Sequence, residues 1–186
     1  KLDKLKNFLE KHKNEEILIF GFTYIVWSHF YEAIEKNKIK INMNNCILVH
    51  GGGWKKLINK KITNEKFKDN LKEKLKISKV YNYYGMVEQT GSIFMECEKG
   101  FFHASDFSDI IIRKSDLTVC ENKKEGIVQL LSLLPTSYPG HSILTDDIGF
   151  IEGVDDCKCN KKGKYFKITQ RVSKSDLRGC SDTFEI

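Results

Sequence analysis

The stretch YYGMVEQTGSIFMEC, residues 83–97, is the point at which the pattern of the sequence changes. It begins as a strand, breaks at Gly85, offers the carboxylate of Glu88, and resumes as an apolar run that ends at Cys97. Apolar and amphipathic segments alternate before this stretch, whereas short apolar segments separated by turns follow it. The stretch therefore predicts a join between a parallel α/β portion and a β-rich portion.

The portion before the stretch has the order of helix and strand expected for parallel crossovers. Short apolar runs at 16–22 and 45–50 are typical of buried strands. Amphipathic spacing predicts helices over 2–13, 23–36 and 64–76, the last with Thr63 as its N-cap. Because strands and helices alternate, we expect an α/β fold with a parallel sheet.

The portion after the stretch is mostly β. Strands are predicted at 92–97, 109–113, 126–133, 142–145 and 165–171. Tyr138-Pro139-Gly140 and the segment 160–163 supply turn residues between them. The fold class is therefore α/β, with a parallel βαβ portion followed by a β-rich portion.

The composition favours a folded cytoplasmic protein. Of the 186 residues, 40% are hydrophobic, and no apolar run reaches the roughly 18 residues of a membrane span. The net charge of +6 comes from scattered lysines interleaved with 25 acidic residues, so we expect a solvated surface and no nucleic acid partner. In the cytoplasm, six cysteines predict thiols, metal ligands or a nucleophile rather than disulfides.

Two glycine-bearing turns follow predicted strands: Gly51, Gly52 and Gly53 in the first, and Tyr84 to Glu88 in the second. Ligands of open α/β sheets bind beyond the carboxyl ends of the strands, so we expect the two turns to be neighbours. Glycines admit a ligand close to the backbone, a tyrosine offers a stacking face, and a glutamate offers a hard oxygen to a cation. A nucleotide with Mg²⁺ fits all three features; an ordinary loop and an ordinary turn are the alternative.

Two further features surround the glycine run. It lacks the spacing and the Ser/Thr of a G-x-x-x-x-G-K-[ST] phosphate loop, so that motif is excluded. His50 comes directly before the run, where it either lines the ligand pocket or makes a structural hydrogen bond to a neighbouring loop.

Cysteines and one histidine in the β-rich portion suggest a separate metal site. Cys97 and His103 are separated by five residues, and Cys157 and Cys159 by one, with both pairs at predicted turns. Three sulfurs and one imidazole make a tetrahedral zinc shell, and four protein ligands leave no position for a reactive water. The pattern is compatible with a structural zinc; two unrelated pairs of surface and core thiols are the alternative.

Two later segments, SILTDDIG at 142–149 and QRVSK at 170–174, occur in the order found in adenylate-forming enzymes, which the chain resembles. In that superfamily a Tyr-Gly-x-x-Glu turn holds adenine and Mg²⁺, a Thr-Gly-Asp turn holds the ribose hydroxyls, and a Gly-Arg-x-Asp segment leads into a C-terminal lid. The resemblance implies that Glu88 binds Mg²⁺ and that Arg171 lies near the phosphates. Together with the glycine run, it implies ATP or AMP binding by Gly51, Gly52, Gly53, Tyr84, Gly85, Thr145 and Asp147.

The chain departs from the superfamily in two respects. Gln170 stands where glycine is usual, and Ser173 stands where a hinge aspartate is common. The Ser/Thr/Gly-rich loop that holds the triphosphate is also missing, and the chain opens with Lys1 on a helix pattern. We therefore expect a fragment that is inactive alone: residues 1–170 as the C-terminal part of the adenylate-forming core, and 171–186 as a hinge with the start of a lid or tail.

Four segments together resemble the LuxE-type acyl-protein synthetases, relatives of the phenylacetate–CoA ligases. They are HGGGWKK at 50–56, YGMVEQTGSIFMEC at 84–97, SYPGHSILTDDIG at 137–149 and RGCSDTFEI at 178–186. The resemblance implies that a fatty or other carboxylic acid is activated with ATP, transferred to a cysteine near the C-terminus, and passed to an acyl reductase partner. It also supports the structural zinc, since relatives in the phenylacetate–CoA ligase group can hold one at these Cys and His positions.

Cys180 is the candidate acyl acceptor. It follows Arg178 and Gly179 on a short tail, and a nearby cation favours the reactive thiolate. An inert thiol at a chain end is the alternative. Two other functions stay open: an acyl–CoA ligase of the phenylacetate type, in which coenzyme A replaces Cys180, and a non-catalytic, zinc-stabilised interaction module that binds no AMP.

Overall fold

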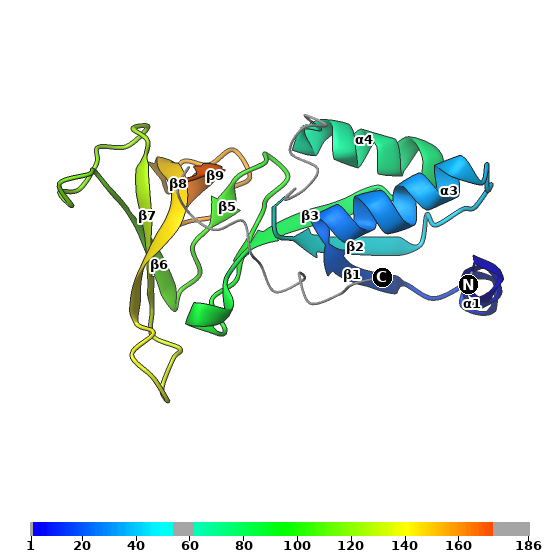
Figure 1. The fold of residues 1–186 in the computed structure, drawn as a ribbon, viewed down its shortest axis with the longest axis horizontal. Coiled ribbons are helices and arrows are strands. Elements are labelled where there is room, and N and C mark those ends of the chain that lie inside the picture. Colours follow the sequence, from blue (N-terminus) through cyan, green and yellow to red (C-terminus); the bar gives the residue numbers. More distant parts are fainter. Residues whose placement is uncertain (1, 54–61, 173–186) are drawn as a thin grey trace. The chain divides into compact units, whose positions relative to one another are not determined.

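The computed structural model describes residues 2–53 and 62–172 of the chain. The chain forms two compact units, unit 1 (Lys1–Asn82) and unit 2 (Tyr83–Ile186). Figure 1 shows the elements of each unit. The boundary between the units falls at the first residue of the 83–97 stretch, where the sequence pattern changes.

Unit 1 has the predicted alternation of helices and strands. Its elements are α1 (Leu2–Lys11), β1 (Ile17–Phe22), α2 (Thr23–Ile25), η1 (Val26–Tyr31), α3 (Glu32–Lys36), β2 (Cys46–Gly51), α4 (Asn64–Leu75) and β3 (Lys79–Tyr84), whose last two residues belong to unit 2. β1 pairs with β2 in parallel, from Ile17 opposite Cys46 to Phe22 opposite Gly51. The predicted parallel crossover is therefore confirmed.

The segment predicted as one helix over 23–36 is helical but irregular. Its middle part, η1, is a π-helix, and the backbone amide of Glu32 donates to the carbonyl of Trp27 five residues earlier. The Trp27 indole Nε1 donates to Glu32 Oε1 at 2.9 Å, and the Trp27 and Tyr31 rings stack at 4.5 Å. An amphipathic pattern predicts a helix but does not distinguish a π-helical turn from an α-helical one.

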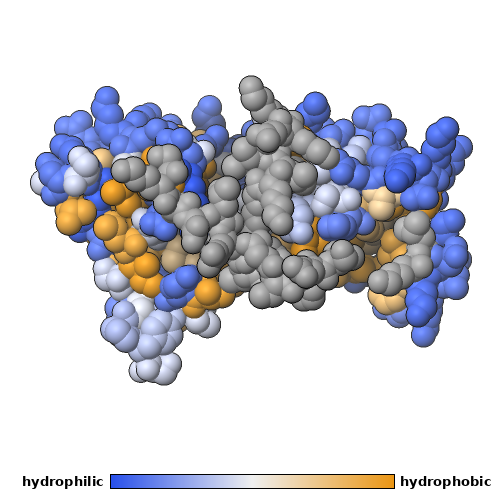
Figure 2. Space-filling view, in the orientation of Figure 1, coloured by the Kyte–Doolittle hydropathy of each residue, from blue (hydrophilic) through white to orange (hydrophobic). Residues whose placement is uncertain are grey.

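Helices and sheet of unit 1 enclose one apolar core. Leu48 of β2 and Phe67, Leu71 and Leu75 of α4 are fully buried. The Thr63 hydroxyl accepts a hydrogen bond from the Lys66 amide, which confirms the predicted N-cap of α4. Figure 2 shows hydrophilic side chains over α3 and α4, in agreement with the solvated surface expected from the scattered charges.

Unit 2 is β-rich, as predicted. It contains η3 (Val87–Gln89), β4 (Phe94–Met95), β5 (Phe102–His103), β6 (Ser108–Arg113), β7 (Gly126–Ser132), β8 (Ser142–Val154) and β9 (Lys164–Arg171). Five of these strands form an antiparallel sheet in the order β5-β9-β8-β7-β6. β4 pairs with the end of β3, with Tyr84 opposite Phe94.

Two strand predictions in unit 2 were wrong in extent, and one short strand was not predicted. The strand predicted at 142–145 continues to Val154, the one predicted at 92–97 is reduced to Phe94–Met95, and β5 was not predicted. The acidic pair Asp146 and Asp147 interrupts the apolar run of β8, yet the backbone continues because the β9 side supplies its partners: Asp147 pairs with Arg171, and the Val172 amide donates to the Asp146 carbonyl. The ladder to β7 is irregular at this place. The two residues of β5 are too few to give an alternating pattern.

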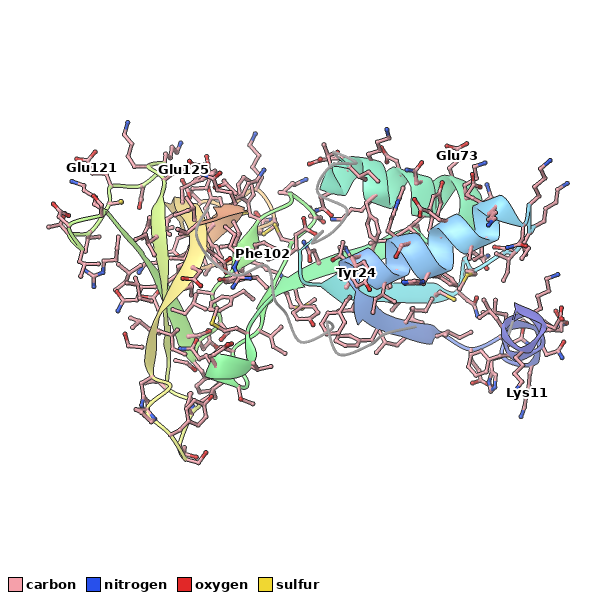
Figure 3. The ribbon with its side chains drawn as sticks, viewed as in Figure 1. Lys11, Tyr24, Glu73, Phe102, Glu121 and Glu125 are labelled. Atoms are coloured by element: carbon pink, nitrogen blue, oxygen red, sulfur yellow. The ribbon has the colours of Figure 1, made fainter. Side chains whose placement is uncertain are left out.

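The core of unit 2 lies against the five-stranded sheet. Its fully buried members include Phe94, Ile110, Val128, Leu130 and Phe166. Phe102, labelled in Figure 3, is partly buried and packs against this cluster. A smaller buried cluster contains Cys97, Cys157 and Tyr165. In the described part of the chain, no helix is both long and apolar enough to cross a membrane.

Candidate nucleotide and metal sites

The predicted nucleotide residues of unit 2 converge on Tyr84 and Asp147. Tyr84 ends β3 and Asp147 lies in β8, and the Tyr84 hydroxyl donates a hydrogen bond of 2.7 Å to Asp147 Oδ2. Burial raises the pKa of Tyr84 far above its ordinary value, and the negative charge of Asp147 raises it further. Tyr84 is therefore a neutral donor that fixes the orientation of the Asp147 carboxylate.

Thr145 and Arg171 complete this arrangement. The buried Thr145 hydroxyl donates to the Val128 carbonyl at 2.9 Å and accepts from the Asp147 amide at 3.0 Å. Arg171 lies opposite Asp147 in the β8–β9 ladder, with its Nε 3.9 Å from Asp147 Oδ1. Its Nη2 is 3.8 Å from Asp146 Oδ2. The fold thus brings together a phenol, a hydroxyl, a guanidinium and carboxylates from three separate strands.

Gly85 and Glu88 lie in the turn that follows Tyr84. A Cβ on Gly85 would meet the Ser92 carbonyl oxygen at 3.0 Å, so a side chain there would crowd the backbone. Glu88, in η3, is exposed and has no hydrogen bond or ion pair with another described residue. Its carboxylate is therefore available to a hard cation such as Mg²⁺.

The glycine run lies in unit 1, at the end of β2. Gly52 has a φ of +77°, a conformation that L side chains rarely adopt, and the Thr23 hydroxyl donates to the Gly51 carbonyl at 3.1 Å. No described atom lies within 4 Å of a Cβ added at Gly53. The predicted proximity of this run to Tyr84 stays a prediction.

His50 makes a structural hydrogen bond in the core of unit 1. The side chain is buried, with Nδ1 at 2.9 Å from the Thr23 hydroxyl and the ring centroid 4.6 Å from that of Phe67. Burial, assisted by the positive charge of Lys68, lowers the pKa of His50 to about 3. The imidazole is therefore neutral, and its hydrogen-bond partner is the first residue of α2 rather than a neighbouring loop. A place for His50 in a ligand pocket stays a prediction.

The predicted metal ligands converge in unit 2. One donor atom from each of Cys97, His103, Cys157 and Cys159 lies within 4.8 Å of every other. Cys97 Sγ is 4.0 Å from Cys157 Sγ, and Cys159 Sγ is 3.3 Å from His103 Nε2. Tetrahedral zinc with bonds of about 2.3 Å to sulfur places neighbouring sulfurs about 3.7 Å apart. The three sulfurs and one nitrogen therefore fit a zinc ion in both type and spacing.

The surroundings of these donors also suit a metal. Burial raises the pKa of Cys157 to about 11, so that this thiol keeps its proton unless a cation replaces it. Burial acts in the same direction on Cys159, but hydrogen bonds from the Lys161 backbone and the neighbouring thiols outweigh it and lower the pKa. Burial and the charge of Lys161 lower the pKa of His103, which keeps its imidazole in the neutral form that binds metals.

The other predicted site residue, Cys180, lies outside the described residues, as does Ser173. The aromatic side chains around Tyr84 were not predicted from the sequence. The Tyr84 ring centroid lies 6.1 Å from that of Phe94, 6.0 Å from Phe102 and 6.2 Å from Phe166. No local signal in the sequence links Phe94 to Phe166 some 70 residues later.

Solved structures share this fold. A 2-hydroxyisobutyryl-CoA ligase, in complex with 2-HIB-AMP and CoA, matches 92% of this chain and 39% of its own length at 18% identity, with a TM-score of 0.69. A long-chain-fatty-acid-CoA ligase from Archaeoglobus fulgidus matches 92% of this chain and 37% of its own length at 12% identity, with a TM-score of 0.61. A structure of McyG A-PCP with phenylalanyl-adenylate matches 92% of this chain and 33% of its own length at 18% identity, with a TM-score of 0.59.

These similarities define the class: the chain has the fold of a part of the adenylate-forming enzymes. Residues 1–185 match the model of the family described as acyl-protein synthetase, LuxE, and the chain therefore belongs to that family. It spans between 33% and 39% of the length of these three solved structures. No curated protein sequence matches it.

Proposed function

We propose that this chain is the C-terminal part of an adenylate-forming core that activates a carboxylic acid with ATP. The observation that carries the proposal is the Tyr84–Asp147 hydrogen bond with Arg171 alongside, in a chain of the acyl-protein synthetase family. In this proposal Tyr84 offers its ring to adenine, Asp147 accepts hydrogen bonds from the ribose hydroxyls, and Arg171 lies near the phosphates. Thr145 holds the backbone that carries Asp147. A contribution of Gly51, Gly52 and Gly53 to nucleotide binding stays a prediction from the sequence.

The first reaction is attack of the acid's carboxylate oxygen on the α-phosphorus of ATP. The new O–P bond gives the acyl adenylate, and the bond to the β-phosphate oxygen breaks to release pyrophosphate. This chemistry depends on alignment and on neutralising phosphate charge, which Arg171 provides from the protein. Glu88 is the residue that would hold Mg²⁺, and the ion would supply further positive charge at the phosphates.

We propose Cys180 as the acyl acceptor in the second reaction. Its thiolate attacks the acyl carbon, a thioester forms, and the bond from that carbon to the phosphate oxygen breaks to release AMP. The acyl group then passes to an acyl reductase partner. The family match supports this route, and the fatty acid–CoA ligase among the similar structures is consistent with a fatty acid as the substrate.

An acyl–CoA ligase is the second candidate, because the structure with the TM-score of 0.69 is a CoA ligase crystallised with CoA. The two candidates differ in the acceptor of the acyl group. A Cys180→Ser change abolishes covalent labelling of the protein by a radioactive acid if Cys180 is the acceptor, and leaves acyl–CoA formation intact if CoA is. A non-catalytic zinc module, the third possibility, predicts no AMP binding.

The metal site has a structural role in this proposal. Zinc held by Cys97, His103, Cys157 and Cys159 has four protein ligands and connects the loop after β4 with the loop between β8 and β9. We also propose that catalysis requires the remainder of the core, which the compared structures have and this chain does not span. A cytoplasmic location stays a prediction.

Nucleotide binding by this chain tests the proposal directly. Isothermal titration with AMP in the presence of MgCl₂ is expected to give one site per chain. Asp147→Ala is expected to abolish the binding, whereas Asp116→Ala, which removes an exposed carboxylate in the loop between β6 and β7, should leave it unchanged. Equal binding by both variants, or none by the unaltered chain, would contradict the assignment of Asp147.

A further inference from the structure

The ring of Tyr84 is held by three phenylalanines. Besides their contacts with Tyr84, Phe94 and Phe166 meet edge-on at 5.3 Å, and Phe102 lies 5.7 Å from Phe166. Phe94 and Phe166 have no exposed surface, and Phe102 is partly buried. Close-packed aromatic rings rarely move independently. The position of the Tyr84 ring therefore depends on these three side chains, which we call the phenylalanine cluster.

Each member of the phenylalanine cluster is connected to the metal site, two of them along the chain and one by strand pairing. Phe102 directly precedes the ligand His103, and Phe94 stands three residues before the ligand Cys97. Phe166 pairs with Phe102 across the β5–β9 ladder.

Contacts beside the cluster strengthen this connection. Tyr165 pairs with His103 in the same ladder, and its ring stacks on the imidazole at 5.7 Å with an interplanar angle of 16°. The Cys97 amide donates to the Phe101 carbonyl at 2.8 Å, which joins the segments that carry Cys97 and Phe102.

We propose that the phenylalanine cluster positions Tyr84 and transmits metal occupancy to it, so that metal binding and nucleotide binding strengthen each other. The nucleotide half of this inference rests on the proposed function. β5 has only two residues, so its place beside β9 depends on few backbone hydrogen bonds. A metal that joins His103 to Cys97, Cys157 and Cys159 would hold β5, and with it Phe102, against Tyr84.

Thermodynamic linkage makes the inference measurable in both directions. If zinc tightens AMP binding by a given factor, AMP must tighten zinc binding by the same factor. We expect about a 10-fold effect, within the range of roughly 5- to 150-fold that is usual for coupled sites. Phe102 acts here as a positioning residue, since it touches Tyr84 and adjoins a metal ligand.

The experiment compares the reduced chain loaded with one equivalent of Zn²⁺ and the chain stripped by a chelator. Titration with AMP and MgCl₂ gives the affinity in each state, and amide hydrogen exchange is read at Tyr84, Phe94 and Phe102. We expect tighter AMP binding and slower exchange in the zinc form, while exchange in β6 and β7 stays the same. The Phe102→Leu variant is expected to lose most of the difference, and Phe107→Leu, at a side chain that is 59% exposed, to retain it.

The outcomes separate this inference from the proposed function. If AMP binds in neither metal state, the proposed function fails, and the exchange at Tyr84 still decides whether the metal orders the phenylalanine cluster. Loss of zinc by Phe102→Leu but not by Phe107→Leu supports the inference. It would show that the phenylalanine cluster affects zinc binding, as zinc is proposed to affect the cluster. The inference is overturned if the two metal states have equal AMP affinity and equal hydrogen exchange at Tyr84. It is also overturned if the unaltered chain binds no zinc.

Discussion

The Tyr84 hydroxyl donates a 2.7 Å hydrogen bond to Asp147 Oδ2, which joins the end of β3 to β8 across 63 residues of sequence. The bond joins two of the three segments in which the sequence predicted nucleotide contacts. Because the acceptor is a carboxylate and Tyr84 is partly buried, the bond is charge-assisted and of the stronger kind.

Replacing Tyr84 with phenylalanine keeps the ring and removes the hydrogen bond. We expect the free energy of unfolding to fall by about 1–3 kcal/mol, since a hydrogen bond to a charged group is lost. AMP affinity should also fall, because the Asp147 carboxylate loses the donor that orients it. Urea denaturation and AMP titration measure the two effects. Tyr81→Phe, at a side chain that is 39% exposed, is the matched control and should change neither by much. An unchanged Tyr84→Phe protein would contradict the role of the hydrogen bond.

Thr145 is predicted to act through the backbone. Thr145→Val keeps the shape but removes the donor to the Val128 carbonyl and the acceptor for the Asp147 amide. We expect a loss of about 1–3 kcal/mol in the free energy of unfolding, because buried groups lose their partners. Thr118→Val, in the exposed loop after β6, serves as the control. A loss in AMP affinity without any loss of stability would instead indicate direct contact of the Thr145 hydroxyl with the ribose.

Removal of one metal ligand is expected to remove the metal. The reduced chain should contain one zinc per molecule by elemental analysis, and Cys157→Ser should contain a small fraction of that and melt at a lower temperature. Cys120→Ser changes a buried cysteine that is not among the four ligands, and should retain the zinc. Zinc-free protein after careful preparation under reducing conditions would refute the four-ligand site.

His50 should make stability depend on pH. The unfolded chain takes up a proton near the ordinary pKa of 6.5, whereas the folded chain does so only near pH 3, so the unfolded state binds more protons between these values. His50 therefore lowers the free energy of unfolding as the pH falls below about 6.5, by at most about 1.4 kcal/mol per pH unit. Denaturation of the unaltered chain and of His50→Gln at pH 7 and pH 5 measures this effect. The free energy of unfolding should decrease less between these pH values in the variant. His141→Gln, at an exposed histidine, should behave as the unaltered chain does; an identical pH dependence in His50→Gln would contradict the assignment.

The class of fold could be predicted because its signals are local. Apolar runs at β1 and β2 with an amphipathic segment between them predict a parallel crossover, and Thr63 marks the start of α4 by its capping hydroxyl. The two metal-ligand pairs were also found by short spacings. Their meeting, with Cys97 4.0 Å from Cys157, depends on pairing between distant strands, which the spacings alone do not specify.

Other features lack a local signal. β5 exists because Phe102 and His103 pair with Phe166 and Tyr165, not because its own two residues favour a strand. The phenylalanine cluster around Tyr84 has members at positions 94, 102 and 166, so only the tertiary fold brings them together. The π-helical turn at Val26–Tyr31 has the same amphipathic pattern as an α-helix.

Isotope exchange between pyrophosphate and ATP measures the adenylation of a carboxylic acid. The assay uses a polypeptide in which this chain is joined to the rest of an adenylate-forming core, with a panel of fatty and other carboxylic acids. We predict exchange that requires one of these acids and MgCl₂, and that Asp147→Ala reduces by at least about 10-fold, the factor equivalent to 1.4 kcal/mol. No exchange with any acid, in a folded protein that contains the whole core, would rule out adenylation by this protein.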